Sequence, residues 1–140
     1  MVRTGSAAET EAFGGRLAES LERGDVVLVS GELGCGKTTL IRGACRELGV
    51  EGPIVSPTFT IGRRYSGRIS VSHLDLFRLH TLVGEDPGLL DDYLTPDAVA
   101  FIEWPAVAEA AVREAIATRG ARLRRVEIRY AGGDRREITA

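Results

Sequence analysis

The chain has 140 residues, of which 44% are hydrophobic, and a formal net charge of -2 at pH 7. This length and apolar content fit a single domain spanning residues 1–140 and leave little room for a second one. The small negative charge argues against a protein that coats nucleic acid. The first residues contain no apolar stretch of signal-peptide type, and no run of about 18 or more apolar residues occurs, so we expect a soluble cytoplasmic protein without membrane contact.

The predicted elements begin with a helix and a strand ahead of a glycine-rich segment. Residues 7–21 form an amphipathic helix that stops near Gly24. Residues 25–30 are an apolar, β-branched run, which is typical of a strand buried on both faces in a parallel sheet. The side chains that the helix is expected to turn toward the core are Ala12, Phe13, Leu17, Ala18 and Leu21.

Residues 31–38 read Gly-Glu-Leu-Gly-Cys-Gly-Lys-Thr, which is a complete G-x-x-x-x-G-K-[ST] phosphate-binding loop. Lys37 in this loop is the chain's only lysine, since the other 17 basic residues are arginine. A compact ammonium fits between the β- and γ-phosphates of a nucleotide, whereas a planar guanidinium does not. The preceding strand and the helix predicted over residues 38–48 supply the context that this motif requires, so a chance glycine-rich turn is rejected.

The loop and the helix after it are expected to bind the phosphates together. Glycines let the loop turn its backbone N–H groups inward, and the positive end of the helix strengthens the field at the phosphates. Thr38 has the position to offer its hydroxyl to a magnesium ion. Cys35 is either a small side chain that fills the loop or an oxidisable thiol. The predicted nucleotide-binding residues are Gly31, Leu33, Gly34, Cys35, Gly36, Lys37, Thr38 and Thr39.

The remaining segments alternate between strand and helix patterns, and two of them read as β-hairpins. This alternation, with a phosphate loop between the first strand and its helix, predicts an α/β fold. We expect a three-layer, P-loop NTPase-like domain whose central sheet is mixed but largely parallel and carries antiparallel hairpins. In chain order the segments are a hairpin turning at residues 66–67, a helix over 87–94, a strand over 98–102, a helix over 105–118 and a hairpin over 123–139.

Two acidic residues stand at the ends of predicted strands. Asp75 ends the second strand of the first hairpin in the manner of a Walker B aspartate, and Glu103 follows the apolar strand over residues 98–102. Phosphate-loop enzymes place carboxylates at such strand ends to hold magnesium and to position water. Each carboxylate considered singly could equally be a solvated side chain. Both together with the loop indicate a nucleotide hydrolase.

Thr58 and two missing motifs bear on which nucleotide is bound. Thr58 follows Ser56-Pro57 beyond the loop helix, where GTPase-like proteins place a threonine that senses the γ-phosphate. An ordinary threonine at a strand start is the alternative. The usual guanine-binding motif, Asn/Thr-Lys-x-Asp, needs a second lysine, and no Asp-x-x-Gly switch occurs either. ATP with Mg²⁺ is therefore the expected ligand.

Four segments follow one another along the chain. They are the loop at 31–39, Ser-Pro-Thr-Phe-Thr at 56–60, His-Leu-Asp-Leu-Phe-Arg-Leu at 73–79 and Ile-Glu-Trp-Pro at 102–105. In this order they resemble the TsaE (formerly YjeE) family of bacterial ATPases, which act in the synthesis of tRNA threonylcarbamoyladenosine. The resemblance covers nearly the whole chain and is more specific than the phosphate loop alone. It departs at Cys35, where alanine is usual, and after Pro105, where relatives often have a shorter connection.

The resemblance implies a Mg²⁺-dependent ATPase that assists TsaD and TsaB, a pair in which TsaD transfers a threonylcarbamoyl group to an adenosine of tRNA. ATP hydrolysis would reset the TsaB–TsaD complex between turnovers, and contact with tRNA would be indirect, through that complex. Catalytic roles are implied for Lys37, Thr58, Asp75 and Glu103. Thr38, Glu103 and Asp75 would lie at the metal, and Thr58 would report the γ-phosphate.

Several alternatives stay open. Trp104 could line the site or cap the core, and Arg135 and Arg136 compete for a contact to the nucleotide. The hairpin arginines could contact tRNA or an acidic partner, or form a solvated face. A small-molecule kinase would need an acceptor pocket and an arginine-bearing lid, for which residues 63–68 are the only candidate. A non-hydrolysing ATP sensor would keep its role after Glu103→Ala.

Overall fold

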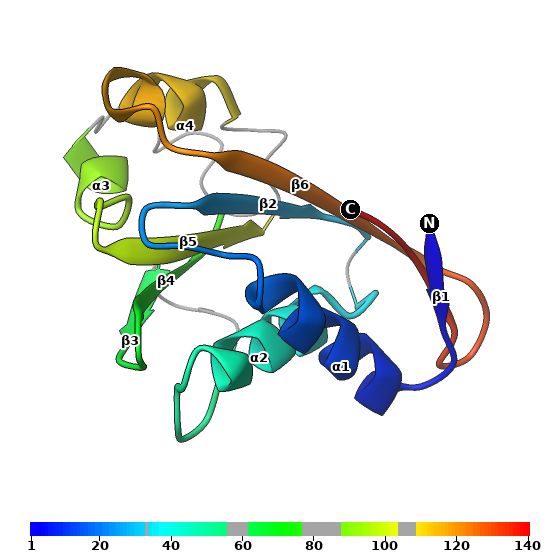
Figure 1. The fold of residues 1–140 in the computed structure, drawn as a ribbon. Helices are drawn as coiled ribbons and strands as arrows, with labels where there is room; N and C mark the ends of the chain where they lie inside the picture. Colours follow the sequence, from blue (N-terminus) through cyan, green and yellow to red (C-terminus); the bar gives the residue numbers. More distant parts are fainter. Residues whose placement is uncertain (33, 56–61, 77–87, 104–108) are drawn as a thin grey trace.

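A computed structural model describes residues 1–32, 34–55, 62–76, 88–103 and 109–140 (Figure 1). Its helices and strands are listed here in chain order. They are β1 (Val2–Thr4), α1 (Ala7–Ala18), β2 (Val26–Ser30), α2 (Lys37–Glu47), β3 (Gly62–Tyr65), β4 (Ser70–Asp75), α3 (Gly88–Asp91), β5 (Ala98–Glu103), α4 (Glu109–Ile116), the 3-10 helix η2 (Ala117–Arg119), β6 (Leu123–Tyr130) and β7 (Arg136–Thr139).

The described strands form one mixed sheet in the order β1-β7-β6-β2-β5-β4-β3. Its centre is parallel, because β2 pairs in parallel with β5 and β6, and β5 pairs in parallel with β4. The edges are antiparallel, with β3 on β4 at one side and β7 and β1 beyond β6 at the other. The predicted mixed sheet with antiparallel hairpins is therefore confirmed.

Helices cover both faces of the sheet and create two separate cores (Figure 1). Alternate residues of a strand point to opposite faces, and β2 illustrates this. Its Val27 and Val29 pack in the core formed with α1 and α2, whereas Val26 and Leu28 pack in the core formed with α3 and α4. This arrangement is the three-layer architecture that the sequence predicts.

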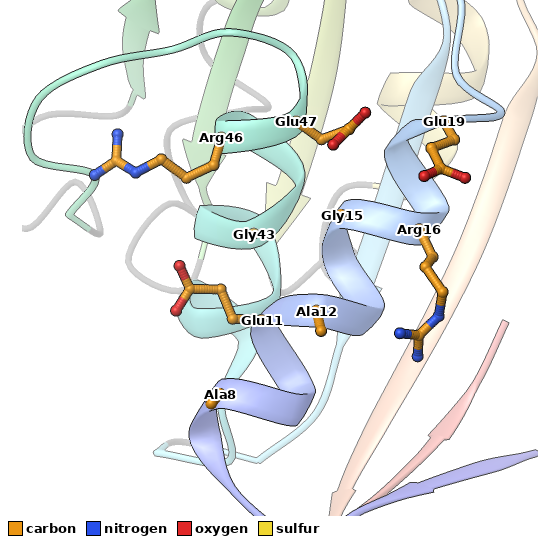
Figure 2. A pocket seen from close by; sticks show the side chains of 9 residues that line it. All are labelled: Ala8, Glu11, Ala12, Gly15, Arg16, Glu19, Gly43, Arg46 and Glu47. Atoms are coloured by element: carbon orange, nitrogen blue, oxygen red, sulfur yellow. The ribbon is translucent and has the colours of Figure 1, made fainter.

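Helix α1 packs on α2 through backbone contact at two glycines. A Cβ atom at Gly14 would lie 1.9 Å from the Leu40 carbonyl oxygen, and one at Gly43 would lie 1.8 Å from that of Glu11. Figure 2 shows Gly15 and Gly43 on facing turns of the two helices, with Glu11 beside Gly43. No side chain would fit between the helices at Gly14 or at Gly43.

This close crossing corrects the predicted orientation of the first helix. Ala12 was expected in the core and is exposed, and Phe13 is only partly buried. Gly14 is buried in their place, together with Leu17 and Ala18 as predicted. Hydrophobic periodicity counts apolar side chains and gives glycine no weight, so it misplaces a helix face that packs through its backbone.

Strand β1 is not predicted by the sequence. It has three residues and pairs with β7, and the Thr4 hydroxyl lies 2.7 Å from the hydroxyl of Thr10 on α1 in a buried contact. The other strands match the predictions within one or two residues. Helix α3 is shorter than expected, α4 is described from Glu109 onward, and the predicted helix start at residues 105–108 lies outside the described residues.

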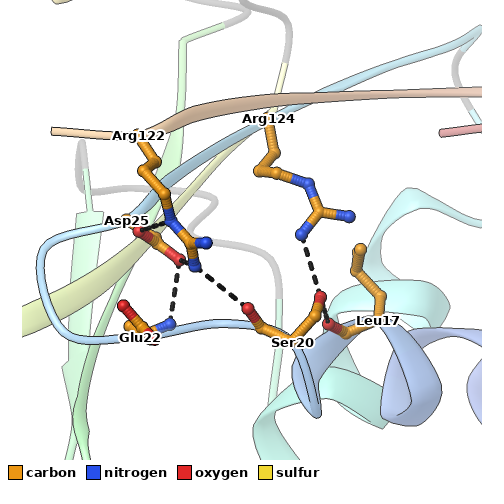
Figure 3. A network of polar contacts seen from close by, with 6 residues as sticks. All are labelled: Leu17, Ser20, Glu22, Asp25, Arg122 and Arg124. Carbon is orange, nitrogen blue, oxygen red and sulfur yellow. Dashed lines mark hydrogen bonds and ion pairs between the residues drawn. The ribbon is translucent and has the colours of Figure 1, made fainter.

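A buried aspartate ties the entry of β2 to the start of β6 (Figure 3). The Asp25 carboxylate accepts hydrogen bonds from the Glu22 backbone N–H at 2.8 Å and from Nε of Arg122 at 2.9 Å. Arg124 donates to the Ser20 hydroxyl at 2.9 Å. Burial would raise the pKa of Asp25, but the hydrogen bonds and charge of Arg122 outweigh it and hold that pKa below its usual value.

Within the described part of the chain, no helix is long and apolar enough to cross a membrane.

Candidate functional site

The phosphate loop joins the end of β2 to the start of α2, as the motif requires. Gly36 precedes the helix with φ of 105°, a left-handed conformation that favours glycine. Gly31 lies so close to β6 that a Cβ atom there would be 2.5 Å from the carbonyl oxygen of Ile128. Both glycines are therefore needed for the shape of the loop. Thr39 follows in the first turn of α2 and is half-buried.

The side chain of Lys37 folds back over the loop. Its Nζ donates hydrogen bonds to the carbonyl oxygens of Gly31 and Glu32, each at 2.8 Å, and the residue is only 4% exposed. Burial lowers the pKa of Lys37, and interactions with Cys35 and then with Glu103 and Asp75 oppose that shift electrostatically. The ammonium thus bonds to the loop and is within electrostatic reach of both predicted catalytic carboxylates.

The predicted metal-binding residues lie together at the carboxyl ends of the central strands. The Thr38 hydroxyl donates to Oε1 of Glu103 at 3.4 Å, and Glu103 is 3% exposed. Asp75 lies directly opposite Glu103 in the parallel pair of β4 and β5. The structure therefore brings Lys37, Thr38, Asp75 and Glu103 into one site, although 65 residues separate Thr38 from Glu103 in sequence.

The oxygen atoms of this site suit Mg²⁺. Hydroxyl and carboxylate oxygens are hard ligands, and Mg²⁺ is usually held by one or two protein groups together with water and phosphate. The described residues contain no group of three or more His, Cys, Asp or Glu side chains arranged to hold a metal. Thr38 and Glu103, with Asp75 beside them, are too few ligands for a metal site built of protein alone. They suit a magnesium ion that is held jointly by the protein and a bound nucleotide.

Comparison with known proteins identifies the family. Residues 4–138 match the family model described as "Threonylcarbamoyl adenosine biosynthesis protein TsaE". The chain belongs to the TsaE family. The crystal structure of Bacillus subtilis YdiB has a similar fold, with a TM-score of 0.74 and 30% sequence identity, over 98% of this chain and 80% of that one. The predicted P-loop NTPase-like architecture is thereby confirmed.

Several proteins named "tRNA threonylcarbamoyladenosine biosynthesis protein TsaE" are similar in sequence. The Bacillus subtilis protein is 37% identical over 138 residues, which are 98% of this chain and 82% of that protein. The Mycobacterium leprae protein is 38% identical over 131 residues, or 87% of this chain and 79% of that one. The Synechocystis protein is 41% identical over 107 residues, or 69% of this chain and 64% of its own length.

The thiol of Cys35 fills the loop. The residue is buried, and Sγ lies 4.0 Å from Nζ of Lys37. Burial raises the pKa of the Cys35 thiol, and the nearby Lys37 charge only partly opposes this shift. A buried thiol with a raised pKa is a poor nucleophile. Of the two roles considered for Cys35, the packing role fits its environment.

Two further residues contact the site: Arg136, which competes with Arg135 for a nucleotide contact in the sequence-based prediction, and His73, for which the sequence predicts no role of its own. Nε of Arg136 donates to the carbonyl oxygen of Cys35 at 2.6 Å, and His73 contacts Glu103. Arg136 and Arg135 also line a cavity of about 350 Å³, together with Arg3, Thr4 and other residues near β1 and β7. Of the two competing arginines, Arg136 is thus the one that bonds to the loop. Strand alternation could have revealed His73, two residues before Asp75 on the same face, whereas no local pattern marks Arg136.

Three predicted residues lie outside the described residues. They are Leu33 of the loop, Thr58 of the predicted γ-phosphate sensor and Trp104 after β5. Their predicted roles stay predictions.

Proposed function

We propose that this chain is a Mg²⁺-dependent P-loop ATPase that acts in tRNA threonylcarbamoyladenosine biosynthesis. The observation that carries the proposal is the convergence of Lys37, Thr38 and Glu103 at the phosphate loop in a member of the TsaE family. The names of the similar proteins supply the pathway, and the loop geometry supplies the chemistry.

ATP binding requires the loop to exchange its own contacts for contacts with phosphate. Lys37 would release the carbonyl oxygens of Gly31 and Glu32, which it now bonds, and donate instead to the β- and γ-phosphates. The ammonium and a phosphate carry opposite full charges, and this adds a Coulombic attraction that a neutral carbonyl oxygen does not offer, so the exchange is favourable. Backbone N–H groups at the start of α2 would complete the cradle, because the N-terminus of a helix favours a bound anion.

The acidic end of the site would perform the hydrolytic step. A bound magnesium ion supplies neutralisation of the charge that develops on the phosphate oxygens. Thr38 and Glu103 would hold it through their side-chain oxygens. Asp75 lies opposite Glu103 and would orient the attacking water, and Thr58 would respond to the γ-phosphate. Arg136, which bonds to the loop, also lines a cavity of about 350 Å³, and we propose that cavity as the place for the base and ribose.

We propose TsaD and TsaB as the protein partners, with tRNA contacted only through their complex and hydrolysis resetting that complex between turnovers. The charge distribution favours indirect contact with tRNA. Basic side chains on β6 and in the turn before it are paired with acidic groups of this chain, which lowers the positive charge that remains for phosphate backbones. The pairs are Arg122 with Asp25, Arg125 with Glu109, and Arg129 with Glu127.

Calorimetric titration with ATP and Mg²⁺ tests the nucleotide site. Lys37→Ala is expected to weaken ATP binding at least tenfold, since it removes a charged contact to phosphate worth roughly 1.5–3 kcal/mol. Glu47→Ala is the matched control, because Glu47 is exposed at the opposite end of the same helix. Equal affinities for the two variants would contradict the proposed site.

A further inference from the structure

A buried histidine contacts the carboxylate that is expected to hold the metal. The His73 side chain is 0% exposed, and its Nε2 lies 2.6 Å from Oε2 of Glu103. The other carboxylate oxygen, Oε1, accepts the hydrogen bond from the Thr38 hydroxyl. One carboxylate oxygen of Glu103 therefore contacts a residue inside the sheet, and the other accepts a hydrogen bond from a residue of the phosphate loop.

Strand register explains how His73 reaches Glu103. His73 lies opposite Phe101 in the parallel pair of β4 and β5, and Glu103 is two residues further along β5. Residues two apart in a strand share a face, so the two side chains are diagonal neighbours on the face that packs against α2. Such diagonal pairs are within reach of long side chains. The contact comes from regular strands, which hold functional side chains more precisely than loops do.

The other ring nitrogen of His73, Nδ1, makes no stabilising hydrogen bond like that of Nε2 within the described residues. Nδ1 of His73 is buried and has no hydrogen-bond partner in the described part of the chain. A buried polar atom without a partner costs about 1–3 kcal/mol. The ring centroid of Tyr65 is 6.5 Å away in a tilted arrangement, a contact that an apolar side chain could also make. An apolar residue would thus fill this position at lower cost, unless the bond to Glu103 has a purpose.

We propose that His73 is a positioning residue for Glu103. Its Nε2–H holds Oε2, so that Oε1 stays turned toward Thr38 and a metal bound there. The inference rests on the proposed function, because it assigns a role within the same site. Groups that hydrogen-bond to metal-ligating side chains orient them, and their loss typically lowers metal affinity by about 10–100-fold.

Two amide variants separate the Nε2 contact from general packing. His73→Gln places an N–H close to the position of Nε2, whereas His73→Asn places one close to that of Nδ1. Ser72→Ala is the matched control, since Ser72 is the buried neighbour on the opposite face of β4 and loses a hydrogen bond of 2.8 Å to the Tyr93 carbonyl oxygen. The measurements are Mn²⁺ affinity in the presence of ATP by electron paramagnetic resonance, ATP affinity in EDTA, and urea unfolding without metal.

His73→Asn is expected to weaken Mn²⁺ binding about tenfold or more, with His73→Gln retaining most of the affinity. ATP affinity in EDTA should stay at the wild-type value in both, which a general packing defect would not allow. Equal Mn²⁺ affinities for His73→Asn and Ser72→Ala, or equal losses in the two His73 variants, would overturn the positioning role. A wild-type protein that binds neither ATP nor Mn²⁺–ATP would overturn the proposed function and this inference with it.

A measurement on the wild-type side chain keeps the test decisive if the variants fail to fold. The chain has two histidines, so their ring N–H signals can be assigned by nuclear magnetic resonance. We expect a slowly exchanging Nε2–H proton for His73 that shifts strongly in Glu103→Gln. A His73 signal that is unaffected by this substitution would refute the contact.

Discussion

Gly14 sets the distance between α1 and α2, and replacing it with alanine measures how much the close crossing contributes to stability. The added Cβ atom would lie 1.9 Å from the Leu40 carbonyl oxygen and 2.9 Å from the Leu40 carbonyl carbon. Both are backbone atoms, so no change of rotamer relieves the clash. The helices would have to separate by roughly 1 Å to restore ordinary contact, which is a case of core overpacking.

The expected loss follows from two opposing effects. Alanine gains about 1 kcal/mol over glycine in helix propensity. Overpacking costs about 1–3 kcal/mol, and the separated helices also lose packing contacts. We therefore expect Gly14→Ala to lower the free energy of unfolding by about 2 kcal/mol. The adjacent Gly15 is the control, because a Cβ atom there meets only the Gly43 carbonyl oxygen at 3.7 Å. Gly15→Ala should therefore stabilise the protein by up to about 1 kcal/mol.

Urea unfolding followed by circular dichroism, without nucleotide, gives both free energies. Ligand is left out because it would stabilise the folded state by mass action. At about 3 °C per kcal/mol for a chain of this size, Gly14→Ala should also lower the melting temperature by about 6 °C. A Gly14→Ala protein as stable as Gly15→Ala would refute the close approach of the two helices.

Three further predictions concern the buried ion pair and the site. Asp25→Asn should cost about 1–3 kcal/mol at pH 7 by urea unfolding. Folding lowers the pKa of Asp25, so its ionised carboxylate stabilises the folded state at pH values above the unfolded-state pKa near 3.8. This stabilisation is lost as the pH falls through the folded-state pKa, and the unfolding free energies of wild type and variant should therefore converge in acid. Arg136→Ala should weaken ATP binding several-fold in a fluorescence titration, with little effect of Arg135→Ala, since Arg136 bonds to the loop carbonyl at residue 35. Glu103→Gln and Asp75→Asn should bind ATP within a few-fold of wild type yet lose most hydrolysis in a phosphate-release assay, and wild-type turnover in both would contradict their roles.

The sequence predicts the features that depend on local pattern or on strand ends. The phosphate loop is a contiguous motif, and its helix has apolar positions at regular spacing, so both are found where expected. Asp75 and Glu103 are far apart in sequence, but the carboxyl ends of parallel strands meet at one edge of a sheet, which predicts their proximity.

Features that arise from long-range packing escape the sequence. Arg136 reaches the loop across 101 residues, and nothing around it distinguishes it from Arg135. Gly14 becomes part of the core only because the backbone of α2 at Leu40 lies directly against it. The three residues of β1 carry too little pattern to indicate a strand, and their pairing with β7 depends on the completed sheet.

Mg²⁺-dependent ATP hydrolysis, measured with and without TsaB and TsaD from the same source, tests the proposed function most directly. Lys37→Ala serves as the blank, because it removes the ammonium from the phosphate loop. We expect slow turnover of the protein on its own and strong stimulation by the pair, and neither in Lys37→Ala. ATP binding without stimulated hydrolysis would contradict the ATPase function and favour a nucleotide sensor, whereas transfer of phosphate to a small molecule would favour a kinase.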